Sequence, residues 1–466
     1  MLLSRLRQIA GTEQVLTAPA DTAAYLTDWR GRFTGRAQAV VRPSNASEVA
    51  AIVAACAETH TPIVPQGGNT GLAGGATPDT SADAVVLSLK RLNRVRGIDA
   101  INGTITVDAG CVLRDVQQAA EAGGRLFPLS LAAEGSATIG GNLSTNAGGT
   151  QVLRYGNARE LALGLEVVLP SGELWNGLRA LRKDNTGYDL RDLFIGAEGT
   201  LGVITAACLK TFPLPRSQVT ALFALDSVAA ALSLLPLAQS LAGPTLTAFE
   251  FFSSTCLQLV LRHFPQQRSP LERDHSQYVL LELSDHEDER HAAALLQSIA
   301  EQALEKRLIA DAVIAQSAGQ GRSLWTLRES ISEAQARDGK NIKHDISVPI
   351  SSIARFIEQT DALLAQRFPG IRMVTFGHLG DGNLHYNVMP PPGTDEGRFF
   401  EQQSAIYECV HDQVTLFSGS ISAEHGIGQL KREENMRYKS PVEMKLMRAL
   451  KQTLDPLNIM NPGKVV

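Results

Sequence analysis

Cysteine is scarce in this chain of 466 residues, and none of its five cysteines belongs to a CxxC pair. A disulfide framework is therefore not expected, and the thiols fit a reducing compartment. No basic block is present and the net charge is −5, which argues against a nucleic-acid or anionic-membrane surface. No apolar run suffices for a bilayer span or a secretory signal. We expect a cytoplasmic enzyme without a nucleic-acid partner or a transmembrane segment.

Glycine, by contrast, is abundant and clustered. The segment PQGGNTGLAGG follows a short predicted strand, and consecutive amides in such a loop can form a nest for a pyrophosphate. The pattern matches neither a Walker loop nor a Rossmann fingerprint. A second glycine-rich stretch, residues 134–149, adds serine, threonine and asparagine donors. Two such loops indicate a long, charged ligand with a polar heterocycle.

The pattern of the chain changes near Arg216, after which strands and helices alternate. We expect strands at 221–226, 246–252, 278–284 and 312–315, with helices at 227–241 and 289–304. This βαββαβ order is that of a split ferredoxin-like unit. Further expected elements are helices at 321–337, 352–368, 398–417 and 442–454, a strand near Ile346, and a β-hairpin over 371–388.

Several segments resemble the FAD-binding domain of the vanillyl-alcohol oxidase-type flavoproteins: PQGGNTGL, IGGNLSTNAGG, LGLEVVLPSGE, DNTGYDLRDLFIGAEGTLGVIT and DPLNIMNPGK. The resemblance implies an α+β fold with a two-part, PCMH-type FAD-binding domain (1–215). A ferredoxin-like substrate or cap domain (216–417) and a C-terminal helical segment that returns to the FAD domain (418–466) would follow. The implied cofactor contacts are Pro65, Gly67, Gly68, Asn69, Thr70, Gly71, Leu72, Ser136, Thr138, Gly141, Asn142, Thr145, Asn146, Glu198, Gly202, Ile204 and Asn461. The first loop holds no histidine or cysteine, so we expect non-covalent FAD.

Two short segments carry a cluster of histidines. His378 and His385 flank a Gly-Asp-Gly turn, and a hairpin would bring their side chains close together. Asn387 follows on the same strand face as His385. The segment SAEHGIG then supplies Glu424 and His425. Two histidines and a carboxylate form a three-ligand set with an open position for substrate, although ligand type does not select among Zn²⁺, Mn²⁺ and Fe²⁺. Taken singly, each histidine also fits a hydrogen-bonded structural role.

The segments GHLGDGNLHYNV, SAEHGIG, LWTLRESI and KHDISVPI are similar to the D-2-hydroxyglutarate dehydrogenase and D-lactate dehydrogenase branch of this flavin family. The resemblance implies a divalent metal, Zn²⁺ with Mn²⁺ as the alternative, held by His378, His385 and Glu424. It further implies that His425 is the catalytic base. With this branch included, the resemblance covers nearly the whole chain.

Basic residues in these segments bear on the substrate. Arg328 suits bidentate recognition of a carboxylate, and Ser332 lies four residues further along an expected helix, on the same face. Lys343 precedes the motif aspartate by two residues, where D-2-hydroxyglutarate dehydrogenases have a lysine and D-lactate and glycolate enzymes do not. A monocarboxylate would leave this cation buried and unpaired, which is costly. With Asn387 and His378 as further substrate contacts, the sequence predicts D-2-hydroxyglutarate as substrate, with D-malate as the alternative.

The predicted reaction is oxidation of the 2-hydroxy acid to the 2-oxo acid, with hydride transfer to flavin N5. No nicotinamide fingerprint is present, so an electron-transfer flavoprotein or a quinone is the expected acceptor. A D-lactate or glycolate dehydrogenase is the main alternative within the family. A metal-dependent hydrolase and a flavin-binding sensory protein without turnover are alternatives of other classes. Assembly as a homodimer is a further expectation.

Overall fold

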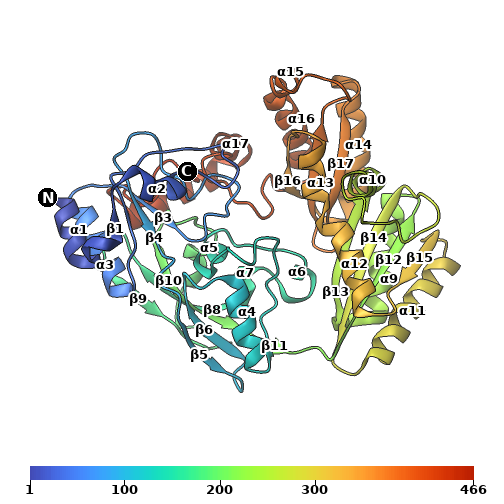
Figure 1. The fold of residues 1–466 in the computed structure, drawn as a ribbon, viewed down its shortest axis with the longest axis horizontal. Coiled ribbons are helices and arrows are strands. Elements are labelled where there is room, and N and C mark those ends of the chain that lie inside the picture. The colour runs from blue at the N-terminus through green and yellow to red at the C-terminus, as the bar shows by residue number, and fades with distance from the viewer. The chain divides into compact units, whose positions relative to one another are not determined.

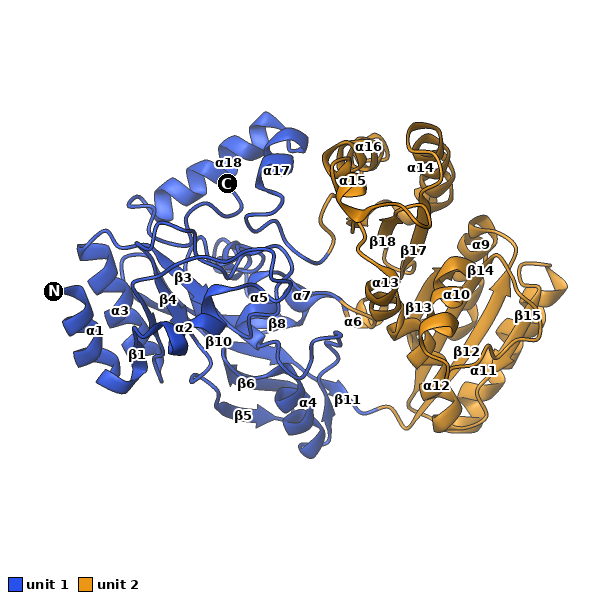
Figure 2. Ribbon diagram, turned by 45° about the horizontal axis from the view of Figure 1, so that its top comes forward, with its two compact units in different colours: residues 1–148, 156–214, 424–466 blue, residues 149–155, 215–423 orange.

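The computed structural model describes residues 1–466, which separate into two compact units (Figure 2). The first unit comprises residues 1–148, 156–214 and 424–466, and the second comprises 149–155 and 215–423. The sequence-based division placed its boundaries after residues 215 and 417. Each unit has its own buried core of aliphatic and aromatic side chains.

The first unit contains two main sheets (Figure 1). The first has the order β1-β2-β4-β3 and consists of β1 (Val15–Leu16), β2 (Ala39–Val41), β4 (Val85–Ser88) and β3 (Ile63–Gln66). The second has the order β5-β6-β10-β8-β9 and consists of β5 (Val95–Asp99), β6 (Thr104–Asp108), β10 (Val203–Lys210), β8 (Ala162–Val168) and β9 (Leu174–Gly177). The strands β7 (Arg125–Leu126) and β11 (Phe212–Pro213) form a separate pair. The central strands are apolar because they are covered on both faces, as in β4 and β10.

Helices of the first unit begin at residues that suit helix N-termini. Asn45 caps α3 (Ala46–Glu58) by accepting a hydrogen bond from the Glu48 amide, and Ser440 forms a capping box with Glu443 at the start of α18 (Pro441–Leu454). The other helices are α1 (Leu2–Ala10), α2 (Pro19–Leu26), α4 (Leu113–Ala122), α5 (Ile139–Ser144), α7 (Ala158–Leu161), α8 (Arg191–Phe194) and α17 (Arg432–Tyr438).

The C-terminal segment belongs to the first unit. After α18 the chain extends alongside β3, where the Ile63 amide donates to the Ile459 carbonyl at 2.7 Å and the Asn461 amide donates to the Ile63 carbonyl at 2.8 Å. Backbone hydrogen bonds on both sides of Met460 therefore hold this segment beside Ile63, at the start of β3.

The second unit is built on one sheet with the order β15-β12-β14-β13-β17-β18-β16. Its first part follows the expected βαββαβ order: β12 (Ser217–Leu225), α9 (Val228–Ala242), β13 (Leu246–Ser253), β14 (Gln277–Asp285), α11 (Glu289–Glu305) and β15 (Asp311–Ile314). The hairpin of β17 (Arg372–His378) and β18 (Asn383–Met389) extends this sheet, and β16 (Asp345–Ser347) closes its edge. The unit also contains the helices α6 (Val152–Tyr155) and α14 (Ile353–Arg367).

Three expectations about helices were wrong. The helix α10 (Ser254–His263) was missed because it begins directly where β13 ends, without turn residues to separate the two periodicities. The helix expected over 321–337 is two helices, α12 (Ala318–Glu329) and α13 (Ile331–Asp338), that meet at Ser330. The helix expected over 398–417 is likewise divided, into α15 (Glu396–Phe400) and α16 (Gln403–Leu416). Hydrophobic spacing is similar across such breaks, so it does not locate them.

One helical stretch, Val228–Thr245, reaches the length and hydropathy of a membrane span, contrary to the expectation that no segment would. One such helix is weak evidence, since core helices of folded domains pass the same test. Its residues Ala231, Leu234, Leu235 and Ala238 are buried, whereas Ser233 and Gln239 are exposed. This amphipathic burial is typical of a helix that covers a sheet.

Candidate active site

The two glycine-rich loops lie against each other in the first unit. A Cβ atom on Gly67 would lie 2.3 Å from Thr138 Oγ1, and one on Gly68 would lie 2.0 Å from the Ser136 carbonyl oxygen. Neither position leaves room for a side chain, so glycine is required for the close approach of the two backbones. The interpretation that the two loops serve one ligand is consistent with this contact.

Polar atoms at this junction lack partners within the protein. Thr138 Oγ1, Asn142 Oδ1 and Asn461 Oδ1 are buried and accept or donate no hydrogen bond. An unsatisfied buried polar group costs about 1–3 kcal/mol. Three of them around two glycine loops are therefore typical of a ligand site, and they fit the pyrophosphate and polar ring system of FAD.

Other predicted cofactor residues approach the same region. Gly199 packs on Pro65, where an added Cβ would lie 3.0 Å from the proline ring. The Asn461 side chain donates to the Gly75 and Glu198 carbonyl oxygens, each at 2.8 Å. Asn69 adopts a positive φ of 58°, and its side-chain Nδ2 donates to the Thr27 carbonyl oxygen at 2.9 Å. These contacts join the first loop, the segment 198–204 and the C-terminal strand.

Glu198 has a role that sequence reasoning missed. Its carboxylate accepts hydrogen bonds from the backbone amides of Ile427, at 2.7 Å, and Gly428, at 2.9 Å. Burial raises the pKa of Glu198 to about 7, although these two amides oppose the shift. The side chain thus anchors the loop that begins immediately after His425. A contact with the cofactor is therefore not the only role to consider for Glu198.

Replacement of Glu198 by glutamine tests this anchoring. Glutamine offers one acceptor oxygen and one amino group, so only one of the two amides keeps its partner. We expect the opening equilibrium of residues 426–428 to shift by about 1–2 kcal/mol, roughly 5- to 30-fold. Hydrogen exchange of that peptide in the FAD-loaded protein measures the shift, with Glu173→Gln, an exposed turn residue, as the control. Unchanged exchange in Glu198→Gln would contradict the anchoring role.

The predicted histidine pair lies on the hairpin of the second unit. Phe376 on β17 pairs with His385 on β18, and His378 lies two residues further along β17, on the same face. The His378 and His385 rings are 5.7 Å apart, centroid to centroid. The expectation that a hairpin brings these side chains together is confirmed.

Glu424 and His425 follow a segment that is hydrogen-bonded to β16. The Ala423 amide donates to the Asp345 carbonyl at 3.3 Å, and Asp345 pairs in register with His385. One ligand atom from each of His378, His385 and Glu424 lies within 4.8 Å of the other two. This donor set suits a divalent cation with an open coordination position.

A second group of possible ligands shares His385. Ligand atoms of Asp345, His385 and His425 also lie within 4.8 Å of one another. Sequence reasoning did not assign Asp345 as a site residue, although it lies in the KHDISVPI segment. The Asn383 side chain donates to Asp345 Oδ1 at 3.1 Å, which fixes the carboxylate beside the histidines.

A buried ion pair on the neighbouring strand was also missed. Glu250 on β13 pairs in register with His378, and its Oε1 accepts a hydrogen bond from His378 Nδ1 at 2.7 Å. Its Oε2 lies 2.7 Å from an Arg328 guanidinium nitrogen. Arg328 is buried and its charge is matched by Glu250. Its predicted contact with the substrate carboxylate stays a prediction.

The other predicted substrate residues differ in their surroundings. Lys343 is half-buried and lies between the bridge residue Ile342 and the start of β16 at Asp345. The Asn387 side chain is already engaged, because its Nδ2 donates to Gln335 Oε1 at 2.9 Å. Ser332 is exposed on α13, and the break at Ser330 means that the helical spacing from Arg328 does not apply.

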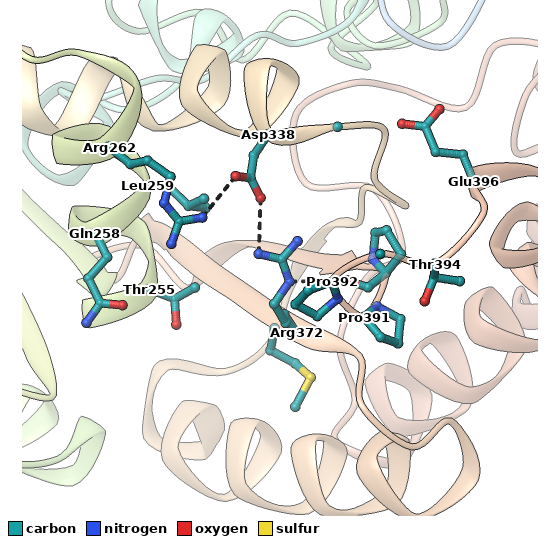
Figure 3. Close-up of a pocket in the computed structure, with 14 residues that line it drawn as sticks. Thr255, Gln258, Leu259, Arg262, Asp338, Arg372, Pro391, Pro392, Thr394 and Glu396 are labelled. Carbon is teal, nitrogen blue, oxygen red and sulfur yellow. Dashed lines mark hydrogen bonds and ion pairs between the residues drawn. The ribbon is translucent and has the colours of Figure 1, made fainter.

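The second unit also has a cavity of about 730 Å³ that contains none of the predicted site residues (Figure 3). Asp338 lies at its rim and bonds to Arg262 at 3.1 Å and to Arg372 at 3.0 Å. His263 also contacts this carboxylate, at 2.9 Å. Both oxygens of Asp338 are therefore occupied by its own neighbours, which is typical of a structural ion-pair network joining α10, α13 and β17.

Comparison with known proteins gives the class of the molecule. Residues 37–177 match the family model for an FAD binding domain, and residues 214–465 match the model for the C-terminal domain of FAD-linked oxidases. The solved structure of p-cresol methylhydroxylase with substrate bound aligns with a TM-score of 0.79, over 100% of this chain and 96% of that one. At 16% identity, this likeness shows the vanillyl-alcohol oxidase-type fold alone.

Curated relatives match nearly the whole chain. A D-2-hydroxyglutarate dehydrogenase of Xanthomonas citri is 41% identical over 99% of this chain and 96% of its own length. The mitochondrial D-2-hydroxyglutarate dehydrogenase of Bos taurus is 40% identical over 97% of this chain and 81% of its own length. A Schizosaccharomyces pombe protein, provisionally named as a mitochondrial D-lactate dehydrogenase, is 38% identical over 97% of this chain and 86% of its own length.

These matches define an FAD-dependent oxidoreductase, as the sequence predicted. The chain belongs to the FAD-linked oxidase family, and within it to the group whose relatives are named D-2-hydroxyglutarate dehydrogenase.

Proposed function

We propose that this protein oxidises D-2-hydroxyglutarate to the 2-oxo acid, with D-malate as a second substrate. The observation that supports this best is one cluster of side chains. His378 and His385 lie together with Glu424 in a possible cation-binding group, and Glu250 contacts both His378 and the buried Arg328. Lys343 precedes the start of β16 by two residues. A 2-hydroxy dicarboxylate presents the complementary groups: one chelating hydroxy acid and a second carboxylate.

In the proposed mechanism, His378, His385 and Glu424 would hold a divalent cation, Zn²⁺ or Mn²⁺. When bound, FAD would supply a hydride acceptor and the cation would lower the pKa of the 2-hydroxyl, much as zinc lowers that of bound water from about 15.7 to about 7. His425 accepts the hydroxyl proton, since an unperturbed imidazole pKa of about 6.5 suits a base near neutrality. Arg328 and Lys343 bind carboxylates and orient the substrate. An electron-transfer flavoprotein or a quinone then receives the electrons.

Lys343 tests the choice of substrate. Loss of a hydrogen bond to a charged group costs about 1.5–3 kcal/mol, so Lys343→Ala should raise KM for D-2-hydroxyglutarate about 10- to 150-fold. KM for D-lactate should stay nearly unchanged, because D-lactate has no distal carboxylate. Lys340→Ala is the matched control, since that side chain is 74% exposed and contacts only Glu396, at 3.6 Å. Equal effects on both substrates would contradict the dicarboxylate assignment.

A D-lactate dehydrogenase is the second candidate, and the provisionally named S. pombe relative supports it. It predicts that D-lactate reduces the flavin faster than D-2-hydroxyglutarate at equal concentration. Steady-state kcat/KM for D-2-hydroxyglutarate, D-malate, D-lactate and glycolate separates the candidates. The dicarboxylate proposal expects the first of these to have the highest value.

A further inference from the structure

Glu250 is a charged residue inside an otherwise apolar strand, LTAFEFFS, and its side chain is 1% exposed. Burial of a carboxylate is costly unless the charge is paired. Burial would raise the pKa of Glu250, but His378 and Arg328 outweigh it and leave the pKa below its ordinary value. Its two oxygens each lie 2.7 Å from a nitrogen of one of these side chains, so the buried carboxylate is held between them.

The contact with His378 determines which ring nitrogen can bind a cation. Because Nδ1 bonds to Glu250 Oε1, the neutral ring carries its proton on Nδ1, and Nε2 is the unprotonated nitrogen that can act as a metal ligand. A carboxylate in this position fixes the tautomer and orientation of a metal-ligating histidine and increases its basicity.

The contact with Arg328 orients the second functional group. One guanidinium nitrogen lies 2.7 Å from Glu250 Oε2, and the guanidinium carbon lies 4.8 Å from the centre of the Phe376 ring. Arg328 Nε is buried and donates no hydrogen bond. The guanidinium is thus held by a carboxylate and an aromatic face.

We propose that Glu250 is a positioning residue shared by the cation site and the substrate site. One carboxylate prepares His378 to bind the cation through Nε2 and holds Arg328 for the substrate carboxylate. Loss of its charge therefore weakens cation binding and substrate binding together. This inference rests on the proposed function, because it takes His378 as a metal ligand and Arg328 as a substrate contact.

Glu250→Gln tests the proposal, since glutamine keeps the size and one acceptor oxygen but removes the charge. We expect the dissociation constant for Zn²⁺ to rise about 10- to 100-fold. Equilibrium dialysis of the FAD-loaded protein followed by metal analysis measures it. KM for D-2-hydroxyglutarate at saturating Zn²⁺ should also rise, while the visible FAD spectrum stays unchanged.

Glu282→Gln is the matched control. Glu282 is a buried carboxylate on the adjacent strand β14, and it accepts from Trp325 Nε1 at 2.6 Å and Thr220 Oγ1 at 3.2 Å. This variant should bind Zn²⁺ as the wild type does. Wild-type affinity in Glu250→Gln would overturn the proposal. A wild-type protein that binds no Zn²⁺ would instead overturn the proposed metal site.

A measurement on the unmodified protein covers the case in which Glu250→Gln does not fold. In metal-free protein above pH 8, ¹⁵N NMR of labelled histidine should show His378 as the Nδ1–H tautomer, assigned by loss of its signals in His378→Gln. An Nε2–H tautomer at His378 would contradict the role proposed for Glu250.

Discussion

Replacing His425 with glutamine is expected to lower kcat for D-2-hydroxyglutarate by about 10²- to 10⁴-fold, the usual contribution of a general base. Glutamine cannot accept the hydroxyl proton. FAD binding should persist, because the residues of the two glycine-rich loops are unchanged. Rapid mixing under anaerobic conditions, with flavin absorbance as the readout, measures the reductive step directly.

The pH dependence sharpens this prediction. The wild-type rate should fall as pH decreases and the imidazole becomes protonated, because the protonated ring cannot act as a base. The His425→Gln variant should lose this acidic limb along with most of its rate. His286→Gln, at an exposed position, is the matched control and should behave as the wild type. A His425→Gln protein with near wild-type reduction rates would remove this residue from the mechanism.

Removal of the divalent cation should have a comparably large effect. Without a cation, the 2-hydroxyl keeps a pKa far above neutrality, and His425 alone cannot deprotonate it efficiently. Treatment with a chelator should therefore abolish reduction of the flavin by substrate while the protein remains yellow. Addition of Zn²⁺ or Mn²⁺ should restore the rate.

The ligands provide a second test of the cation. Glu424→Gln keeps the shape of the side chain but removes an anionic ligand, so it should need a higher Zn²⁺ concentration for half-maximal restoration than the wild type. Metal analysis must verify that the chelated sample is free of metal. Unchanged flavin reduction in such a sample would exclude the cation from the reaction.

The hairpin histidines could be found from sequence because the pattern that indicates them is local. His378 and His385 lie seven residues apart around a glycine-rich turn, and strand alternation places them on one face. The two glycine-rich loops could also be found from sequence, because glycines that permit close backbone approach form a cluster there.

The positioning residues could not be found in this way because their partners are distant in sequence. Glu250 is 128 residues from His378, and Glu198 is 229 residues from Ile427. The available signal for Glu250 was a single charge within an apolar strand, which indicates a buried partner without identifying it. Ser332 shows the opposite error, because a spacing argument assumed one helix across the break at Ser330.

We propose that a D-2-hydroxy dicarboxylate reduces the flavin bound by this chain. The most direct test mixes the yellow protein anaerobically with D-2-hydroxyglutarate, its L-enantiomer and D-lactate, each at the same concentration, and follows the flavin absorbance. We predict rapid bleaching by D-2-hydroxyglutarate, slower bleaching by D-lactate, and none by the L-enantiomer. Absence of bleaching by D-2-hydroxyglutarate in protein with verified FAD and metal content would contradict the account.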